Sequence, residues 1–184
     1  QLDGAHIEFV RGIENPIGIK VGPSTNEEEL VKILDYINPK NEAGKITLIC
    51  RMGADKIDSH LPKIIQKIIK EGKNVVWACD PMHGNTIKSN TGYKTRPVMS
   101  IFSEIQKFFA IHRSLGSDPG GVHLEMTGSD VTECNGGLQE ITDEDLKNRY
   151  HTFCDPRLNA SQSLEIAFLI SEYLKDEKFL SLKS

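Results

Sequence analysis

The sequence predicts an α/β fold with parallel strands, and three observations support this. Short apolar runs rich in β-forming residues alternate with amphipathic, helix-like segments along the chain. Each apolar run is nearly continuous, which is typical of strands buried on both faces of a parallel sheet. Charged or metal-binding side chains stand where these runs end. Four such βα units would form part of a doubly wound sheet or about half of a (β/α)8 barrel, and both architectures place a site at the carboxyl ends of their strands.

The first βα unit is predicted from a strand at residues 16–21 (PIGIKV) and a helix at 27–37. Three glutamates open the helix, where negative charge stabilises the positive end of the helix dipole. Ser24 or Thr25 is the expected N-cap, because either hydroxyl can accept a hydrogen bond from a free backbone N–H of the first turn.

The second and third units follow the same order. A strand at 46–50 (ITLIC) leads to a helix at 60–71, where leucine and isoleucine recur at helical spacing and form an apolar stripe that can pack on a sheet. Gly72 follows this helix as its expected C-terminal cap. The next strand, 75–79 (VVWAC), is followed after a loop by a helix at 98–115. Strands connected through helices in this way are expected to pair in parallel by right-handed crossovers.

The last unit differs from the others in its connection. A strand at 122–126 (VHLEM) is separated from a helix at 161–174 by a long stretch, 127–153, in which no secondary structure is predicted. Loops of this length inside a compact domain tend to be functional. We therefore expect this loop to contribute to a site.

The composition excludes several classes of partner. The chain has 184 residues, with 22 basic and 26 acidic side chains and a formal net charge of −4. No basic run is present of the kind that binds nucleic-acid phosphates or an anionic membrane, and no apolar stretch is long enough to span a bilayer. The four cysteines lack paired spacing and fit reduced thiols in a cytosol-like compartment. Because the first residue is Gln1, with no capping or turn signal ahead of it, we expect a fragment.

Five side chains with binding chemistry stand at the ends of the predicted strands and of the long loop. They are Lys20, Arg51, His83, Glu125 and Asp155, each about one βα unit from the next. Because parallel strands of a barrel end at one rim, we expect these side chains to converge on a common mouth. One imidazole and two carboxylates suit Mn²⁺, Fe²⁺, Co²⁺ or Zn²⁺ better than Ca²⁺ or Mg²⁺.

Purely structural roles are the alternatives at these positions. His83 could be a hydrogen-bonded structural residue, and Glu125 and Asp155 could be ordinary surface carboxylates. Lys20 and Arg51 need anionic partners within a parallel sheet, and these could be a bound phosphate or carboxylate, or a salt bridge inside the chain. The candidate carboxylates for such a salt bridge are Glu14, Asp55 and Asp80.

Two further features lie close to the expected mouth. Cys79 and Cys154 stand near the candidate ligands, but cysteines in apolar strands usually behave as small hydrophobic residues, so we do not assign them to the metal. Lys94, Thr95 and Arg96 form a small cationic loop, which we interpret either as a phosphate-binding segment or as a solvated charged loop.

Longer motifs identify a family. In chain order they are GIENPIGIKVGPS (12–24), ICRMGADK (49–56), CDPMHGNT (79–86), TGYKTR (91–96), GGVHLEMTG (120–128), VTEC (131–134) and CDPRLN (154–159). Over nearly the whole chain this set resembles the type II 3-deoxy-D-arabino-heptulosonate 7-phosphate (DAHP) synthases. The resemblance implies a (β/α)8 (TIM) barrel, of which residues 1–184 would be the C-terminal half and its last four βα units.

The resemblance also implies a reaction and the residues that serve it. The family condenses phosphoenolpyruvate with erythrose 4-phosphate, the first step of the shikimate route to aromatic amino acids. Lys20, Arg51 and His83 are then expected as catalytic residues, with Lys20 and Arg51 holding phosphoenolpyruvate. The metal ligands would be His83, Glu125 and Asp155, with Mn²⁺ or Co²⁺ as the expected metal and Zn²⁺ or Fe²⁺ as alternatives. The aldose phosphate would be held by Lys94 and Arg96.

The departure from the family is the absent N-terminal half of the barrel. The family's fourth metal ligand, a cysteine of the first strand, would lie there, and none of the present cysteines matches it. An inactive remnant that binds anions or a partner is therefore the alternative function, whereas a Schiff-base aldolase is disfavoured because Lys20 comes with a metal-binding set. The full-length protein is expected to be a homo-oligomer, cytoplasmic or plastid-located, with chorismate mutase as a potential partner.

Overall fold

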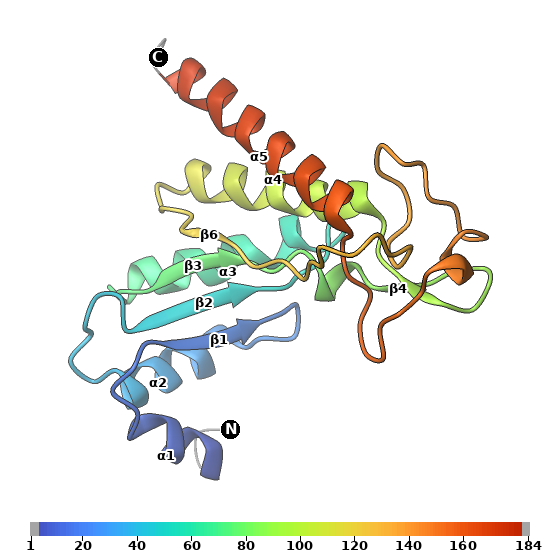
Figure 1. Ribbon diagram of the computed structural model, residues 1–184. Helices are drawn as coiled ribbons and strands as arrows, with labels where there is room; N and C mark the ends of the chain where they lie inside the picture. Colours follow the sequence, from blue (N-terminus) through green and yellow to red (C-terminus); the bar gives the residue numbers. More distant parts are fainter. Residues whose placement is uncertain (1–3, 182–184) are drawn as a thin grey trace.

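The computed structural model describes residues 4–181, and its main feature is a parallel sheet with helices along one face (Figure 1). The elements are, in chain order, α1 (Ala5–Arg11), β1 (Ile17–Val21), α2 (Glu27–Ile37), β2 (Ile46–Cys50), α3 (Ile57–Lys70), β3 (Val76–Cys79), a 3-10 turn (His83–Asn85), β4 (Ile87–Lys88), β5 (Lys94–Thr95), α4 (Val98–Ser114), β6 (Gly121–Val122), a second 3-10 turn (Leu146–Asn148) and α5 (Ala160–Ser181).

The sheet has four strands in the order β1-β2-β3-β6, and every neighbouring pair is parallel. This confirms the predicted α/β fold with alternating β and α units, which is consistent with part of a TIM barrel. β4 and β5 form a separate antiparallel pair within the loop that follows β3. No helix in the described part of the chain is long and apolar enough to cross a membrane.

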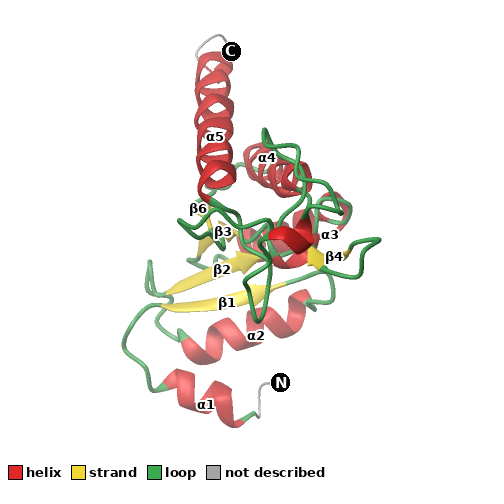
Figure 2. Cartoon of the chain, turned by 45° about the vertical axis from the view of Figure 1, so that its right-hand side comes forward, coloured by secondary structure: helices red, strands yellow, loops and turns green. Residues whose placement is uncertain are grey.

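Side chains of the sheet alternate between a buried and a more open face. Leu48, Cys50, Trp77 and Cys79 are buried and belong to the main hydrophobic core, together with the apolar stripe of α3. Residues of the opposite face are half-buried or exposed, and Val76 is 40% exposed. Figure 2 shows α2 running along the sheet beneath β1.

Three predicted element boundaries were wrong. The last helix, predicted at 161–174, extends from Ala160 to Ser181 as α5. The other two have identifiable reasons. The second helix begins at Ile57 instead of residue 60, because the carbonyl of Gly53 accepts from the N–H groups of Lys56 and Ile57, and because the Ile57 side chain is fully buried. The strand predicted at 122–126 is reduced to β6, although the N–H of His123 still donates to Cys79. The extended segment that follows β6 leaves the sheet and carries Glu125.

The predicted caps had mixed outcomes. Asn26 caps α2 by accepting from the Glu29 N–H, whereas the Thr25 hydroxyl accepts from Gly22 in the preceding turn, so the expectation of Ser24 or Thr25 was wrong. Gly72 takes a left-handed conformation (φ 61°) directly after α3, as expected for a terminating glycine.

The sequence did not predict α1, the β4–β5 pair or the structure within the long loop. α1 buries only Ile7, lacks a side-chain cap and is joined to α2 by Glu8, which accepts from Tyr36. The long loop is not structureless, because it contains the second 3-10 turn and a bridge between Gly136 and Ile141. In Figure 1 this loop lies at the arrowhead end of the strands.

Candidate metal and anion site

The strands end at one level, which brings the segments after them together. The N–H of Arg51 donates to the carbonyl of Val21, that of Asp80 to Cys50, and that of His123 to Cys79. Each residue that follows a strand is thus hydrogen-bonded to the end of its neighbour. Side chains leaving the four strand ends therefore share one rim.

His83, Glu125 and Asp155 form the candidate metal centre at this rim. Each offers one ligand atom, and these atoms lie within 4.8 Å of one another. His83 Nε2 lies 3.3 Å from Glu125 Oε1 and 3.9 Å from Asp155 Oδ2. All three residues are half-buried. One imidazole nitrogen and two carboxylates at this spacing fit a divalent first-row metal ion.

Asp80 sets the position of His83. Its Oδ1 accepts from the backbone N–H groups of Met82 and His83, which is the turn-forming use of an aspartate side chain. Its Oδ2 accepts from His83 Nδ1 at 2.7 Å. The Nε2 edge of the ring therefore faces the two carboxylates.

A buried glutamate of α4 joins the loops after β2 and β3. Glu104 Oε1 accepts from the N–H groups of Met52 and Gly53, and Oε2 accepts from the Asn85 side chain. Burial raises the pKa of Glu104 to about 7, although these hydrogen bonds oppose the shift. The same loops touch closely, since a Cβ built on Gly84 would lie 2.3 Å from the nitrogen of Gly53. Glycine is therefore required at this contact.

Glu125 is held by Arg96, whose side chain is fully buried. Arg96 Nη1 forms an ion pair with Glu125 and donates to the carbonyl of Pro156 at 2.6 Å, and Nε donates to the Thr86 hydroxyl at 2.8 Å. Nη2 is buried and has no hydrogen-bond partner among the described residues. The cationic loop predicted around Arg96 is thus folded inwards at this residue.

Asp155 lies on a loop that Glu133 anchors. Glu133 is fully buried and accepts from the N–H groups of His151 and Thr152 and from both the backbone and the guanidinium of Arg157. Lys94 Nζ lies 3.4 Å from Asp155 Oδ1. Partial burial pushes the pKa of Asp155 upwards, but Lys94 and Arg96 outweigh it and hold the pKa below its usual value.

Lys20 and Arg51 stand on the β1 and β2 side of the rim. Lys20 Nζ forms a 2.5 Å ion pair with Asp80, which is one of the internal salt bridges that the sequence left open. Its side chain is still 41% exposed. Arg51 is exposed beside the end of β1, where a Cβ on Gly22 would lie 4.0 Å from its Nε. Two exposed cations therefore lie at this side of the rim. One of them, Lys20, contacts the same carboxylate oxygen of Asp80 as His83 does.

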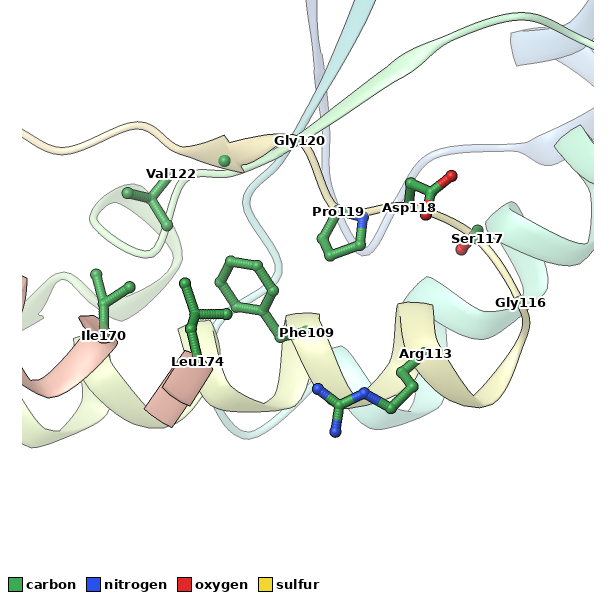
Figure 3. A pocket seen from close by; sticks show the side chains of 11 residues that line it. Phe109, Arg113, Gly116, Ser117, Asp118, Pro119, Gly120, Val122, Ile170 and Leu174 are labelled. Atoms are coloured by element: carbon green, nitrogen blue, oxygen red, sulfur yellow. The ribbon is translucent and has the colours of Figure 1, made fainter. Parts of the chain in front are cut away.

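Two cavities have to be distinguished. A cavity of about 370 Å³ includes Glu125, Asp155, Cys154 and Arg157 and opens at the candidate metal centre. A larger one, about 690 Å³, lies between α4, α5 and the segment before β6, at the opposite end of the strands (Figure 3). Its side chains are mainly apolar, with Phe109 at the centre of the view. Of these two cavities, the smaller is lined by two of the candidate ligands, Glu125 and Asp155, and the larger by none of them.

Comparison with known proteins decides the family. Residues 1–171 match the model of the class-II DAHP synthetase family. The chain belongs to this family. It is 54% identical over 176 residues to the phospho-2-dehydro-3-deoxyheptonate aldolase AroG of Mycolicibacterium smegmatis, covering 96% of the chain and 38% of that relative. It is 52% identical over 177 residues to the phospho-2-dehydro-3-deoxyheptonate aldolase of Streptomyces coelicolor, covering 96% of the chain and 39% of that relative. The chain thus spans less than two-fifths of the length of these class-II relatives.

Three of the four cysteines in this class-II chain are buried, and two of these, Cys50 and Cys79, lie in the sheet. Cys50, Cys79 and Cys134 are free and buried, and burial raises the pKa of each thiol, that of Cys134 to about 12. A thiol that stays protonated is a poor metal ligand. Cys154 is exposed, with Sγ 3.8 Å from Asp155 Oδ2.

Several residues that organise this site were missed by sequence reasoning. Glu104, Glu133 and Arg157 were not singled out, and Asp80 was considered only as a partner for Lys20. The available signal was chemical: Glu104 stands in the apolar face of a helix, and Glu133 lies between Val131 and Leu146, in a stretch where a buried carboxylate requires partners.

Proposed function

We propose that the polypeptide to which this chain belongs is a DAHP synthase, which condenses phosphoenolpyruvate with erythrose 4-phosphate and releases phosphate. The observation that carries the proposal is the convergence of His83, Glu125 and Asp155 at a rim that also bears Lys20 and Arg51. The names of both class-II relatives support it. Four βα units would then form part of a closed (β/α)8 barrel, completed by the rest of the polypeptide.

We assign the metal to His83, Glu125 and Asp155, with Mn²⁺ or Co²⁺ as the best match to this donor set. When bound, the metal would act as a Lewis acid on the aldehyde carbonyl of the aldose. Lys20 and Arg51 would bind the phosphate and carboxylate of phosphoenolpyruvate, and so orient its nucleophilic carbon towards the aldehyde. A carbon–carbon bond then forms, water adds at the second carbon, and phosphate leaves with carbon–oxygen cleavage.

Lys94 and Arg96 receive different roles in this proposal. Lys94 is exposed at the opening, 3.4 Å from Asp155, and can reach a second anionic group such as the phosphate of the aldose. Arg96 has no exposed surface and already pairs with Glu125. We therefore assign Arg96 mainly to holding Glu125 in place, and give it a direct contact with the aldose phosphate only if the loop opens.

The roles are separated by comparing two variants of the full-length protein. His83→Ala removes a ligand, so we expect it to lose bound Mn²⁺ and all metal-dependent turnover while the fold persists. Arg51→Ala is expected to keep its bound Mn²⁺ and to raise the KM for phosphoenolpyruvate, because only a substrate contact is lost. Metal content by elemental analysis and steady-state kinetics distinguish them. Equal loss of metal in both variants would contradict the assignment.

A further inference from the structure

Asp80 is a fully buried carboxylate at the end of β3, between the anion-binding and metal-binding parts of the rim. Oδ2 accepts from Lys20 Nζ at 2.5 Å and from His83 Nδ1 at 2.7 Å. Oδ1 accepts from the N–H groups of Met82 and His83 at 3.1 and 3.2 Å. An ammonium and two backbone N–H groups can only donate, so both oxygens of Asp80 act as hydrogen-bond acceptors.

Because Oδ2 already accepts from the Lys20 ammonium and Oδ1 accepts from two backbone N–H groups, the proton of the contact with His83 lies on Nδ1. In a neutral imidazole the other nitrogen, Nε2, then carries a lone pair. Nε2 is the atom that faces Glu125 at 3.3 Å. A carboxylate behind a metal-binding histidine fixes its tautomer and ring orientation in this way, and increases its basicity as a ligand.

We propose that Asp80 is a positioning residue for both halves of the site: it holds His83 in the tautomer that presents Nε2 to the metal, and it keeps Lys20 at the strand end that receives phosphoenolpyruvate. This inference rests on the proposed function. In this role Asp80 contacts neither the metal nor the substrate. Its one carboxylate prepares the site for both binding events.

Replacement of Asp80 by asparagine tests this with almost no change in side-chain volume. If the NH2 group of the introduced asparagine faces Lys20 and His83, it repels the donors of the lysine ammonium. It also favours the His83 tautomer with the proton on Nε2, and a protonated Nε2 has no lone pair for a metal. If the amide is turned round, its NH2 opposes the backbone N–H groups of Met82 and His83 instead. Neither orientation reproduces the contacts of the carboxylate.

The experiment uses the metal-free full-length protein, with Mn²⁺ alone and phosphoenolpyruvate alone as calorimetric probes. Asp80→Asn is expected to weaken Mn²⁺ binding by about 10- to 100-fold and to weaken phosphoenolpyruvate binding as well. Lys20→Met should weaken phosphoenolpyruvate binding only. The control is Asp58→Asn, which removes an exposed carboxylate 2.7 Å from Lys107, and it should change neither affinity. Bound Co²⁺ should also show an altered visible spectrum in Asp80→Asn but not in Lys20→Met or the control.

A folded Asp80→Asn protein with wild-type Mn²⁺ affinity and an unchanged Co²⁺ spectrum would overturn the inference. If the single variant fails to fold, the double variant Lys20→Met/Asp80→Asn removes both members of the ion pair and leaves no unpaired charge. The loss of Mn²⁺ affinity should persist there, relative to Lys20→Met, and its absence would again count against the inference. A wild-type protein that binds Mn²⁺ through His83 but forms no product would end the proposed function and leave the role of Asp80 standing.

Discussion

At the scale of single residues, the position of Asp155 depends on Glu133. Asp155 lies on a loop without regular secondary structure, so its placement has to come from side-chain contacts. Glu133 provides these by accepting from backbone N–H groups on both sides of Asp155, at Thr152 and Arg157. The guanidinium of Arg157 binds both oxygens of Glu133, and these contacts hold the pKa of Glu133 below its usual value although burial acts in the opposite direction.

We predict that Glu133→Gln lowers both stability and metal affinity. Glutamine has one acceptor oxygen, so it loses part of the paired contact with Arg157 and leaves buried donors unsatisfied. We expect the unfolding free energy to fall by about 2–3 kcal/mol, because the buried carboxylate of the Glu133–Arg157 pair is lost. The loss is limited because Arg157 is partly exposed and can still be hydrated. Urea unfolding and Mn²⁺ titration of the full-length protein measure the two effects. Glu140→Gln, at an exposed position of the same loop, is the control, and equal effects of both variants would contradict the prediction.

The candidate ligands were predictable from the sequence, whereas the residues that support them were not. His83 follows a clear apolar strand, and motif spacing drew attention to Glu125 and Asp155. Asp80 and Glu133 act through hydrogen bonds to segments whose position depends on the tertiary fold. Arg96 looked like a surface cation because its neighbours are polar, and only the fold shows that it is buried against Glu125.

At the scale of elements, α4 carries one buried titratable group towards each end of the sheet strands. Glu104 binds the loops on the site side, as described above. His112, in the last turn of the helix, is fully buried with its ring near Trp77 and Phe108, and its Nδ1 lies 2.7 Å from the Ser117 hydroxyl. Burial lowers the pKa of His112 to about 4.

We predict that His112 and Glu104 make the stability depend on pH in opposite directions. His112 has a lower pKa folded than unfolded, so its contribution is present above about pH 6.5 and is lost as pH falls towards 4. Glu104 has a higher pKa folded than unfolded, so its contribution is present below about pH 4.5 and is lost as pH rises through 7. Each shift corresponds to about 3 kcal/mol across its window. In the wild-type protein the two contributions should largely offset one another between these limits.

Single variants should show the pH dependence of unfolding free energy that each group contributes. Glu104→Gln is expected to make unfolding free energy rise more steeply with pH than in the wild type, and His112→Phe to make it fall. The double variant should have a slope close to that of the wild type, which serves as the internal control. Urea unfolding at several pH values between 4.5 and 6.5 measures the slopes. Identical slopes in all four proteins would contradict the assignment of these shifts.

Elements with strong periodicity were predicted well, and weak ones were not. The sheet strands β1, β2 and β3 and the helices α2, α3 and α4 lie within a few residues of their predicted bounds, because their apolar patterns match their burial. β6 is shorter than its predicted strand, because the chain leaves β3 after His123 and Met126 instead forms a bridge with Leu158. α1 was missed because it depends on contacts with α2 and has no start signal of its own.

At the scale of the whole molecule, the sheet is open. β1 and β6 each have one neighbouring strand, and the face opposite the helices carries exposed Val76. α5 also exposes Leu164 and Phe168. Unpaired strand edges and uncovered apolar surface promote association, whereas a closed barrel has no such edges.

We therefore predict that residues 1–184, expressed alone, self-associate or lack a sharp cooperative melt, and bind Mn²⁺ more weakly than the full-length protein. Addition of the remaining polypeptide as a separate fragment should restore pairing at the edges and part of the activity. Sedimentation velocity and thermal unfolding provide the measurements. A monomer with a cooperative transition and full condensation activity would show that this chain needs no further strands.

We propose that this rim performs a metal-dependent condensation of phosphoenolpyruvate with erythrose 4-phosphate. The most direct measurement follows consumption of phosphoenolpyruvate and release of phosphate by the metal-stripped full-length protein, before and after addition of Mn²⁺, in the wild type and in Glu125→Ala. We predict turnover only in the wild type, only with both substrates present and only after Mn²⁺ is restored. Undiminished turnover by the metal-stripped protein, or by Glu125→Ala, would contradict the claim.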